Sequence, residues 1–172
     1  MKKVCYNTHM QIEWKNIEDK QIKIINGWLN DKDKVNLCMT KNNWEQTALA
    51  IEDCLKIMDN SEFKNIMGYI DDKPVVAVMF GIEHIEALNL YNIVISPACR
   101  HMGIAKKVVL QLLKNNKSLN LTKPYKKVVA SILPENIDAK HLFESLNFDN
   151  LGFDGQYVVF EKNIIKTNER VM

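Results

Sequence analysis

The residues best suited to binding chemistry lie in one short turn, residues 100–105, between an apolar run and an amphipathic stretch. The amphipathic stretch predicts a helix beginning at Gly103, and a helix N-terminus presents unpaired N–H groups and the positive end of the helix dipole. Four basic residues surround it, although positive charge there is unfavourable by roughly 0.3–1 kcal/mol per residue: Arg100, His101, Lys106 and Lys107. A bound polyanion would remove this conflict, which favours a phosphate site; the alternative is a solvated basic face on an ordinary helix start.

A second patterned stretch, SILPENIDAKHLFESLNF at residues 131–148, puts a strand-like run before a predicted helix. Together the two stretches resemble the GNAT superfamily of acetyltransferases. Arg100 to Ala105 match the family pattern Q/R-x-x-G-x-G/A after a strand ending in Ile95-Ser96-Pro97, and residues 136–148 are similar to N-x-x-A-x-x-L-Y/F-x-x-x-G-F. The resemblance covers about residues 60–162, whereas residues 1–60 resemble the family in element type only.

The elements that must position these motifs follow from the spacing of apolar residues. Helical spacing predicts a helix from Ile17 to about Asn30 and a second helix from Trp44 to Met58. Strands are predicted at residues 9–14, 63–70, 74–82, 86–95 and 126–132, with further helices at 103–117 and 135–146. Two closing strands meet at Asp154-Gly155, a pair that suits a type I′ turn.

The predicted order is β-αα-βββ-α-β-α-ββ, which indicates an α/β (α+β) fold of the GNAT type. We expect a mixed, mostly antiparallel central sheet of roughly six to seven strands, with four helices distributed on both faces. The 172 residues fit one domain over residues 1–165, followed by a polar tail at residues 166–172.

Composition narrows the classes of partner. No run approaches the roughly 18 apolar residues of a membrane span, and the first residues lack the apolar middle of a signal peptide, so we expect a cytoplasmic protein without a membrane partner. A net charge of +2 predicts no nucleic-acid partner, because a strongly basic stripe would be needed. The scattered cysteines contain no CxxC pair and predict neither a metal site nor a disulfide framework: Cys5, Cys38, Cys54 and Cys99.

The resemblance implies that acetyl-CoA is the co-substrate. The pantetheine arm would enter a V-shaped opening between the fourth and fifth strands and pair with backbone groups of Ile93 and Ile95. Asn136 would reach the pantetheine or sulfur side, and an amide of Ile93 or Val94 would stabilise the oxyanion. The pyrophosphate would lie on the amides of Arg100, His101, Met102, Gly103, Ile104, Ala105 and Lys106.

Three positions depart from the family pattern. His101 replaces a glycine, so its side chain must fit beside the phosphates without forcing a positive φ. Asn147 also replaces a glycine, but asparagine is the next-best residue for the left-handed position after a helix. Phe143 stands where many members have a tyrosine that protonates the departing thiolate; water, or Tyr91, Tyr125 or Tyr157, are the alternatives.

The general base and the acceptor site are less defined by the sequence. Glu83, His84 and Glu86 lie near the hairpin before the fourth strand, and Glu86 is the first choice for the base; exposed polar turn residues are the alternative. Asn89 and Tyr91 share a strand face by period two. The family builds its acceptor site mainly from the first two helices, which implicates Trp28, Asn36, Met39 and Trp44.

The predicted function is therefore an N-acetyltransferase, monomeric or homodimeric, that acts on an amine of a small molecule or peptide. The alternative is a catalytically silent GNAT-like module that binds acyl-CoA as a sensor or interaction domain.

Overall fold

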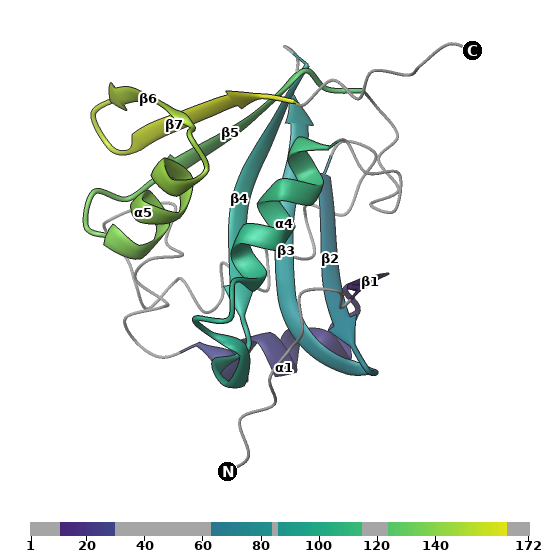
Figure 1. Cartoon of the computed structure of the whole chain (residues 1–172). Helices are drawn as coiled ribbons and strands as arrows, with labels where there is room; N and C mark the ends of the chain where they lie inside the picture. The colour runs from purple at the N-terminus through teal and green to yellow at the C-terminus, as the bar shows by residue number, and fades with distance from the viewer. Residues whose placement is uncertain (1–10, 30–62, 84–85, 115–123, 165–172) are drawn as a thin grey trace.

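The computed structural model describes residues 11–29, 63–83, 86–114 and 124–164. The described strands and helices follow one another in the predicted order (Figure 1). They are β1 (Glu13–Asn16), α1 (Asp19–Trp28), β2 (Phe63–Ile70), β3 (Lys73–Glu83), β4 (Ala87–Ile95), the 3-10 helix η1 (Pro97–Cys99), α4 (Ile104–Leu113), β5 (Lys127–Ile132), α5 (Ile137–Ser145), β6 (Asp149–Phe153) and β7 (Val158–Asn163). The predicted second helix, residues 44–58, lies outside the described residues.

The strands form one seven-stranded sheet in the order β1-β2-β3-β4-β5-β7-β6. β4 and β5 pair in parallel, and the other neighbouring strands pair antiparallel. A parallel pair requires a crossover connection, and α4 lies in the chain between β4 and β5. The mixed, mostly antiparallel sheet of the predicted fold class is thus confirmed.

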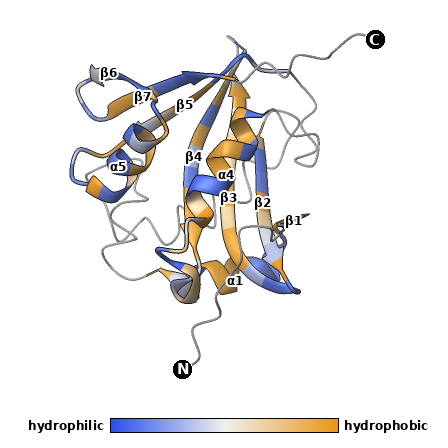
Figure 2. Cartoon of the chain, in the orientation of Figure 1, coloured by the Kyte–Doolittle hydropathy of each residue, from blue (hydrophilic) through white to orange (hydrophobic). Residues whose placement is uncertain are grey.

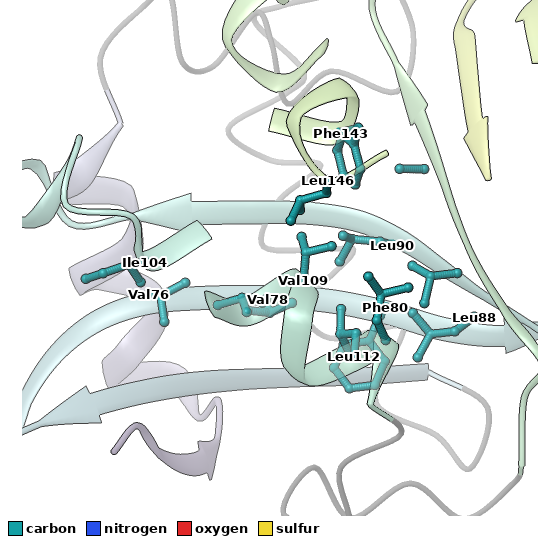
Figure 3. Packing of buried hydrophobic residues seen from close by; sticks show 14 of the residues in the cluster. Val76, Val78, Phe80, Leu88, Leu90, Ile104, Val109, Leu112, Phe143 and Leu146 are labelled. Atoms are coloured by element: carbon teal, nitrogen blue, oxygen red, sulfur yellow. The ribbon is translucent and has the colours of Figure 1, made fainter. Parts of the chain in front are cut away.

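Helices cover both faces of this sheet. The larger core joins α4 and α5 to one face, and Figure 3 shows Phe143 and Leu146 pointing toward Val109 and Leu90. A smaller cluster on the other face joins α1 to the middle strands through Ile22, Ile25, Leu29, Met67, Ala77, Met79 and Val94. β3, which lies between both layers, is the most continuously apolar strand (Figure 2). A strand buried on both faces is expected to lose the apolar and polar alternation.

The turns of the β2–β3 and β6–β7 hairpins have different backbone conformations, and the sequence did not predict this difference. The turn between β2 and β3 has positive φ at both Asp71 (49°) and Asp72 (58°), as a type I′ turn requires. The hairpin predicted at Asp154-Gly155 is confirmed by the pairing of β6 with β7, but the type I′ geometry is wrong, because φ is positive at Gly155 and not at Asp154. There the loop spans residues 154–157, and the Asp154 carboxylate accepts hydrogen bonds from the amides of Tyr157 (2.7 Å) and Gln156 (2.9 Å). These bonds, the Tyr157 bond first, lower the pKa of Asp154. The Asp154 amide in turn donates to the Tyr157 carbonyl at 3.0 Å, which closes the loop between its two end residues.

The first strand is also displaced from its prediction. β1 occupies Glu13–Asn16 rather than residues 9–14, and Trp14 is opposite Gly68 of β2. A Cβ on Gly68 would lie 2.5 Å from Ile12 and 3.0 Å from Trp14, so this register depends on the absence of a side chain. The weak alternation of residues 9–14 carried no information about that close approach. No helix among the described residues is long and apolar enough to span a membrane.

Candidate functional site

β4 and β5 are joined at one end and diverge at the other, which produces the predicted V-shaped arrangement (Figure 1). They pair from Ala87 with Lys127 to Leu90 with Ala130. Beyond these pairs β4 stays with β3 as far as Ile95, whereas β5 stays with β7 as far as Ile132. We call residues 91–95 and 131–132 the diverging segments.

The direction of the main-chain groups on β4 follows from one hydrogen bond. The amide of Ser96 donates to the carbonyl of Val75 on β3 at 2.9 Å. Because backbone groups alternate along an antiparallel strand, Val94 also directs its groups toward β3, whereas Ile93 and Ile95 direct theirs toward β5. Ile93 and Ile95 therefore direct their N–H and C=O groups to where β5 no longer supplies partners, and the Ile95 carbonyl lies 3.4 Å from Arg100 Nε.

The irregular point of β4 is Tyr91. Met79 pairs with Asn92 and Phe80 pairs with Leu90, so Tyr91 is an extra residue, a β-bulge. The amides of Ile93 and Val94, implied by the resemblance as the oxyanion donor, lie two and three positions after this bulge. A signal was present in the sequence, because the apolar alternation of Leu88 and Leu90 changes phase before Ile93 and Ile95.

The turn after η1 takes the left-handed conformation twice before α4. His101 has φ 60° and Gly103 has φ 74°. The expectation that His101 would avoid a positive φ is therefore wrong. A non-glycine residue in this region costs on the order of 1 kcal/mol or more. Of these two positions, only the second has glycine.

The N-terminus of α4 has the properties of an anion site. Gly103 is its N-cap with no side-chain cap, the first turn contains no acidic residue, and the first intrahelical bond runs from Lys107 N to Gly103 O at 3.1 Å. The amides of Ile104, Ala105 and Lys106 therefore precede the helical bonding pattern. A Cβ on Gly103 would meet nothing within 4 Å among the described residues, so there is open space beside this N-cap.

The side chains around this terminus fall into two groups. His101 and Lys106 are exposed and can face an anion. Ile104 is buried in the larger core and Met102 packs against it, so these two residues anchor the turn. Ala105 is half-buried.

The Arg100 side chain extends away from its own turn to α1. Its Nη2 atom donates to the carbonyl oxygen of Trp28 at 2.8 Å, and its Nε atom lies 3.4 Å from the carbonyl oxygen of Ile95. Nothing in the sequence pointed to this contact, which joins residues 72 positions apart.

Asn136 is the N-cap of α5 and lies four positions after the last residue of β5. Its Oδ1 atom accepts a hydrogen bond from the Ala139 amide at 3.1 Å and caps the helix. With Oδ1 used in this cap, the Nδ2 group is the part of the side chain that could donate to a pantetheine arm. Asn147, at the other end of α5, has φ 54°, which confirms the predicted left-handed position.

The candidate catalytic residues lie at different places along β4. Tyr91 lies at the start of the diverging segment, half-buried against the cluster that contains α1, with its ring centroid 5.9 Å from that of Phe63. Glu86 lies before the joined end, where its carboxylate pairs with Lys126 and its carbonyl accepts from the Lys126 amide. His84 and the side chain of Glu83 lie outside the described residues.

The tyrosines predicted to replace the family's tyrosine lie in different parts of the fold. Phe143 is 2% exposed and packs against Phe148 and Phe160 at centroid distances of 4.9 and 5.9 Å. Tyr125 is buried and donates to the carbonyl of Leu112, whereas Tyr157 lies in the β6–β7 loop. Tyr91 lies within the diverging segment of β4, and Tyr157 directly precedes Val158, the β7 partner of Ile132 in the diverging segment of β5.

Of the predicted acceptor residues, Trp28 is half-buried and packs against the same cluster as Tyr91. Both therefore lie on the α1 side of the sheet. Asn36, Met39 and Trp44 lie outside the described residues. Those residues that are described contain no group of three or more His, Cys, Asp or Glu side chains that could hold a metal ion.

Comparisons with known proteins agree with this geometry. Residues 27–148 match the family described as the acetyltransferase (GNAT) family. Among solved structures, the PaiA N-acetyltransferase of Thermoplasma acidophilum in complex with coenzyme A is 13% identical, with a TM-score of 0.62 over 90% of this chain and 99% of that one. A comparison with curated proteins finds no match to the sequence.

Two further structures are similar at the same level. The ribosomal-protein-S18-alanine N-acetyltransferase of Escherichia coli is 12% identical, with a TM-score of 0.61 over 94% of this chain and 99% of that one. The spermidine N-acetyltransferase of Vibrio cholerae in complex with CoA and spermine is 16% identical, with a TM-score of 0.63 over 90% and 96%. At these identities the likeness establishes the fold alone.

Proposed function

The chain belongs to the acetyltransferase (GNAT) family, and we propose that it transfers an acetyl group from acetyl-CoA to a primary amine of a small molecule or peptide. One observation carries the proposal: the diverging segments of β4 and β5 lead to an uncapped helix N-terminus. Ile93 and Ile95 offer main-chain groups in the first region, and the α4 amides offer donors in the second. An extended amide-containing arm that ends in a pyrophosphate has both complementary parts.

The reaction proposed is direct attack. The amine nitrogen bonds to the thioester carbonyl carbon, the resulting oxyanion accepts an N–H from the irregular part of β4, and the carbon–sulfur bond then breaks. The amine loses its proton to a base, and the departing sulfur leaves as thiolate or gains a proton. A thiol pKa of about 8.5 makes the thiolate a tolerable leaving group.

Tyr91 is the favoured candidate for the group that supplies this proton, because it is both the bulged residue and on the α1 side. Glu86, the predicted base, lies five residues earlier, about 17 Å away at roughly 3.3 Å per residue. It would act only through a chain of water molecules.

Two solved structures of similar fold support the two proposed substrates. The Thermoplasma acidophilum protein was crystallised with coenzyme A, and the Vibrio cholerae protein with CoA and spermine. We therefore propose acetyl-CoA as the donor and an amine as the acceptor.

The donor site is tested by two variants of Gly103. Gly103→Asp adds a negative charge beside the proposed pyrophosphate, whereas Gly103→Asn adds a neutral side chain of the same size that tolerates a positive φ. We expect titration calorimetry with CoA to give less than about a fivefold loss of affinity for Asn and at least about a fiftyfold loss for Asp. Equal affinities in the two variants, with matching melting temperatures, would put the donor elsewhere.

A second candidate, the silent acyl-CoA-binding module, is favoured by the burial of Phe143 where the family has its acid. Thiol release from acetyl-CoA, measured against polyamines, amino acids, aminoglycosides and peptide N-termini, separates the two. Release with any of these amines supports the enzyme; CoA binding with no release across the set supports the silent module.

A further inference from the structure

We propose that Arg100 is a positioning residue that links the donor-binding turn to α1, rather than a side-chain ligand of the donor's phosphates. This inference rests on the proposed function for the identity of the donor. The link itself rests on the geometry of Arg100.

The guanidinium group is directed at main-chain oxygens of the protein. Nη2 contacts Trp28 O at 2.8 Å and Nε is near Ile95 O at 3.4 Å. These atoms belong to one rigid, planar group, so their spacing is fixed and each contact orients the other. A lysine at this position would keep the charge but lose the paired geometry.

The carbonyl group that Arg100 contacts is one that the helix cannot satisfy by itself. Trp28 is the last residue of α1, and the last four carbonyls of a helix have no partner within it. The last turn of α1 contains no basic residue of its own. Arg100 supplies both the donor and the positive charge that the negative end of the helix dipole favours.

Arg100 also precedes the N-terminus of α4, which has the opposite dipole charge to the C-terminus of α1. Three positions after Arg100, Gly103 begins α4, where amides and positive dipole face outward. An anion on α4 therefore binds a turn whose side chain is attached to α1. Any shift of the turn on binding is carried directly to the Trp28 carbonyl.

The two ends of α1 are anchored differently. At its start, Gln21 accepts from the Glu18 amide at 3.2 Å and donates to the Tyr69 hydroxyl of β2 at 3.3 Å. At its end, the contact comes from the donor turn. A link at this end therefore brings donor occupancy to the last turn of α1.

Hydrogen exchange of the α1 peptide tests the link without requiring turnover. In the ligand-free protein, Arg100→Gln and Arg100→Lys should both speed exchange in residues 27–29 by at least about fivefold, the factor expected from one lost hydrogen bond of about 1 kcal/mol. Exchange around Gln21 should not change. Unchanged exchange at residues 27–29 in both variants would overturn the link.

Calorimetry with CoA tests the second half of the proposal, with Lys106→Gln as the matched variant of an exposed cation. Arg100→Gln should change CoA affinity less than about threefold and leave its salt dependence intact, whereas Lys106→Gln should weaken both. CoA should slow exchange at residues 27–29 in the wild type but not in Arg100→Gln. A loss of affinity and salt dependence in Arg100→Gln that Arg100→Lys restores would make Arg100 a phosphate ligand and overturn the proposal. Failure of wild-type protein to bind CoA would contradict the proposed function, while the ligand-free exchange still decides the link.

Discussion

The hydroxyl group of Tyr125 donates a hydrogen bond to the carbonyl oxygen of Leu112 in the last turn of α4. Both residues are buried, at 2% and 1% exposure. Tyr125 lies two residues before β5, so this bond attaches the return of the crossover to the helix that makes it. This contact adds to the apolar packing of α4 against the joined end of β4 and β5.

Replacing Tyr125 with phenylalanine tests the strength of that attachment. Tyr125→Phe keeps the ring in the core but leaves the buried Leu112 carbonyl without its donor, which costs about 1–3 kcal/mol. We expect a lower midpoint in urea unfolding with an unchanged m-value. CoA affinity should stay within about twofold of wild type, and a larger change would mean that Tyr125 also shapes the donor site.

The burial of Tyr125 also predicts that the free energy of unfolding falls at high pH. Burial raises the pKa of the Tyr125 hydroxyl well above its ordinary value of about 10. The folded state thus holds the proton more tightly than the unfolded state, so this contribution is complete below pH of about 10 and is lost as pH rises toward the folded pKa. Unfolding free energies measured from pH 8 to 11 should fall more steeply in wild type than in Tyr125→Phe. Parallel profiles would show that other groups cause the decline.

His101 predicts a stabilising substitution. Its φ of 60° is strained for histidine but not for glycine, so His101→Gly should raise the free energy of unfolding by roughly 0.5–1 kcal/mol. His101→Ala is the matched control, because it removes the imidazole and keeps the strain. If both variants weaken CoA binding equally, the imidazole itself contacts the donor; if neither does, the residue contributes strain alone.

Tyr91 and Glu86 are distinguished by turnover with whichever amine gives thiol release. Tyr91→Phe should lower kcat by about 10–100-fold with little change in the KM for acetyl-CoA, as expected for loss of a proton donor. Glu86→Gln removes only an ion pair whose side chains are 51% and 74% exposed, so kcat should change less than about threefold. The reverse pattern would restore Glu86 as the base and require a water chain along β4.

Much of the fold was predictable because its elements depend on local patterns. β2 begins and ends at the predicted residues 63 and 70, since an alternating run is bounded there by the turn at Asp71 and Asp72. The helix after Gly103 was predicted from its amphipathic spacing, and α4 is described from Ile104 to Leu113. In each case a change of period coincides with a turn residue.

The parts that were not predicted depend on pairs of segments. The register of β1 against Gly68 is one such case, and the contact of Arg100 with Trp28 is another. Side-chain hydrogen bonds within a loop had a similar effect, because the Asp154 carboxylate accepts from the Gln156 and Tyr157 amides and Asp154 does not take the positive φ of a type I′ turn. None of these interactions leaves a periodic signal. The Tyr91 bulge did leave one, as the phase change between Leu90 and Ile93.

Four residue pairs, from Ala87 with Lys127 to Leu90 with Ala130, make up the ladder between β4 and β5 in the described part of the chain. They are also the junction between a four-stranded half-sheet, β1 to β4, and a three-stranded one, β5 to β7. A donor bound along Ile93 and Ile95 would lengthen this seam, and the two halves would then unfold with greater cooperativity. The co-substrate would then extend the hydrogen bonding of the sheet while it is bound, and this extension would be lost when it leaves.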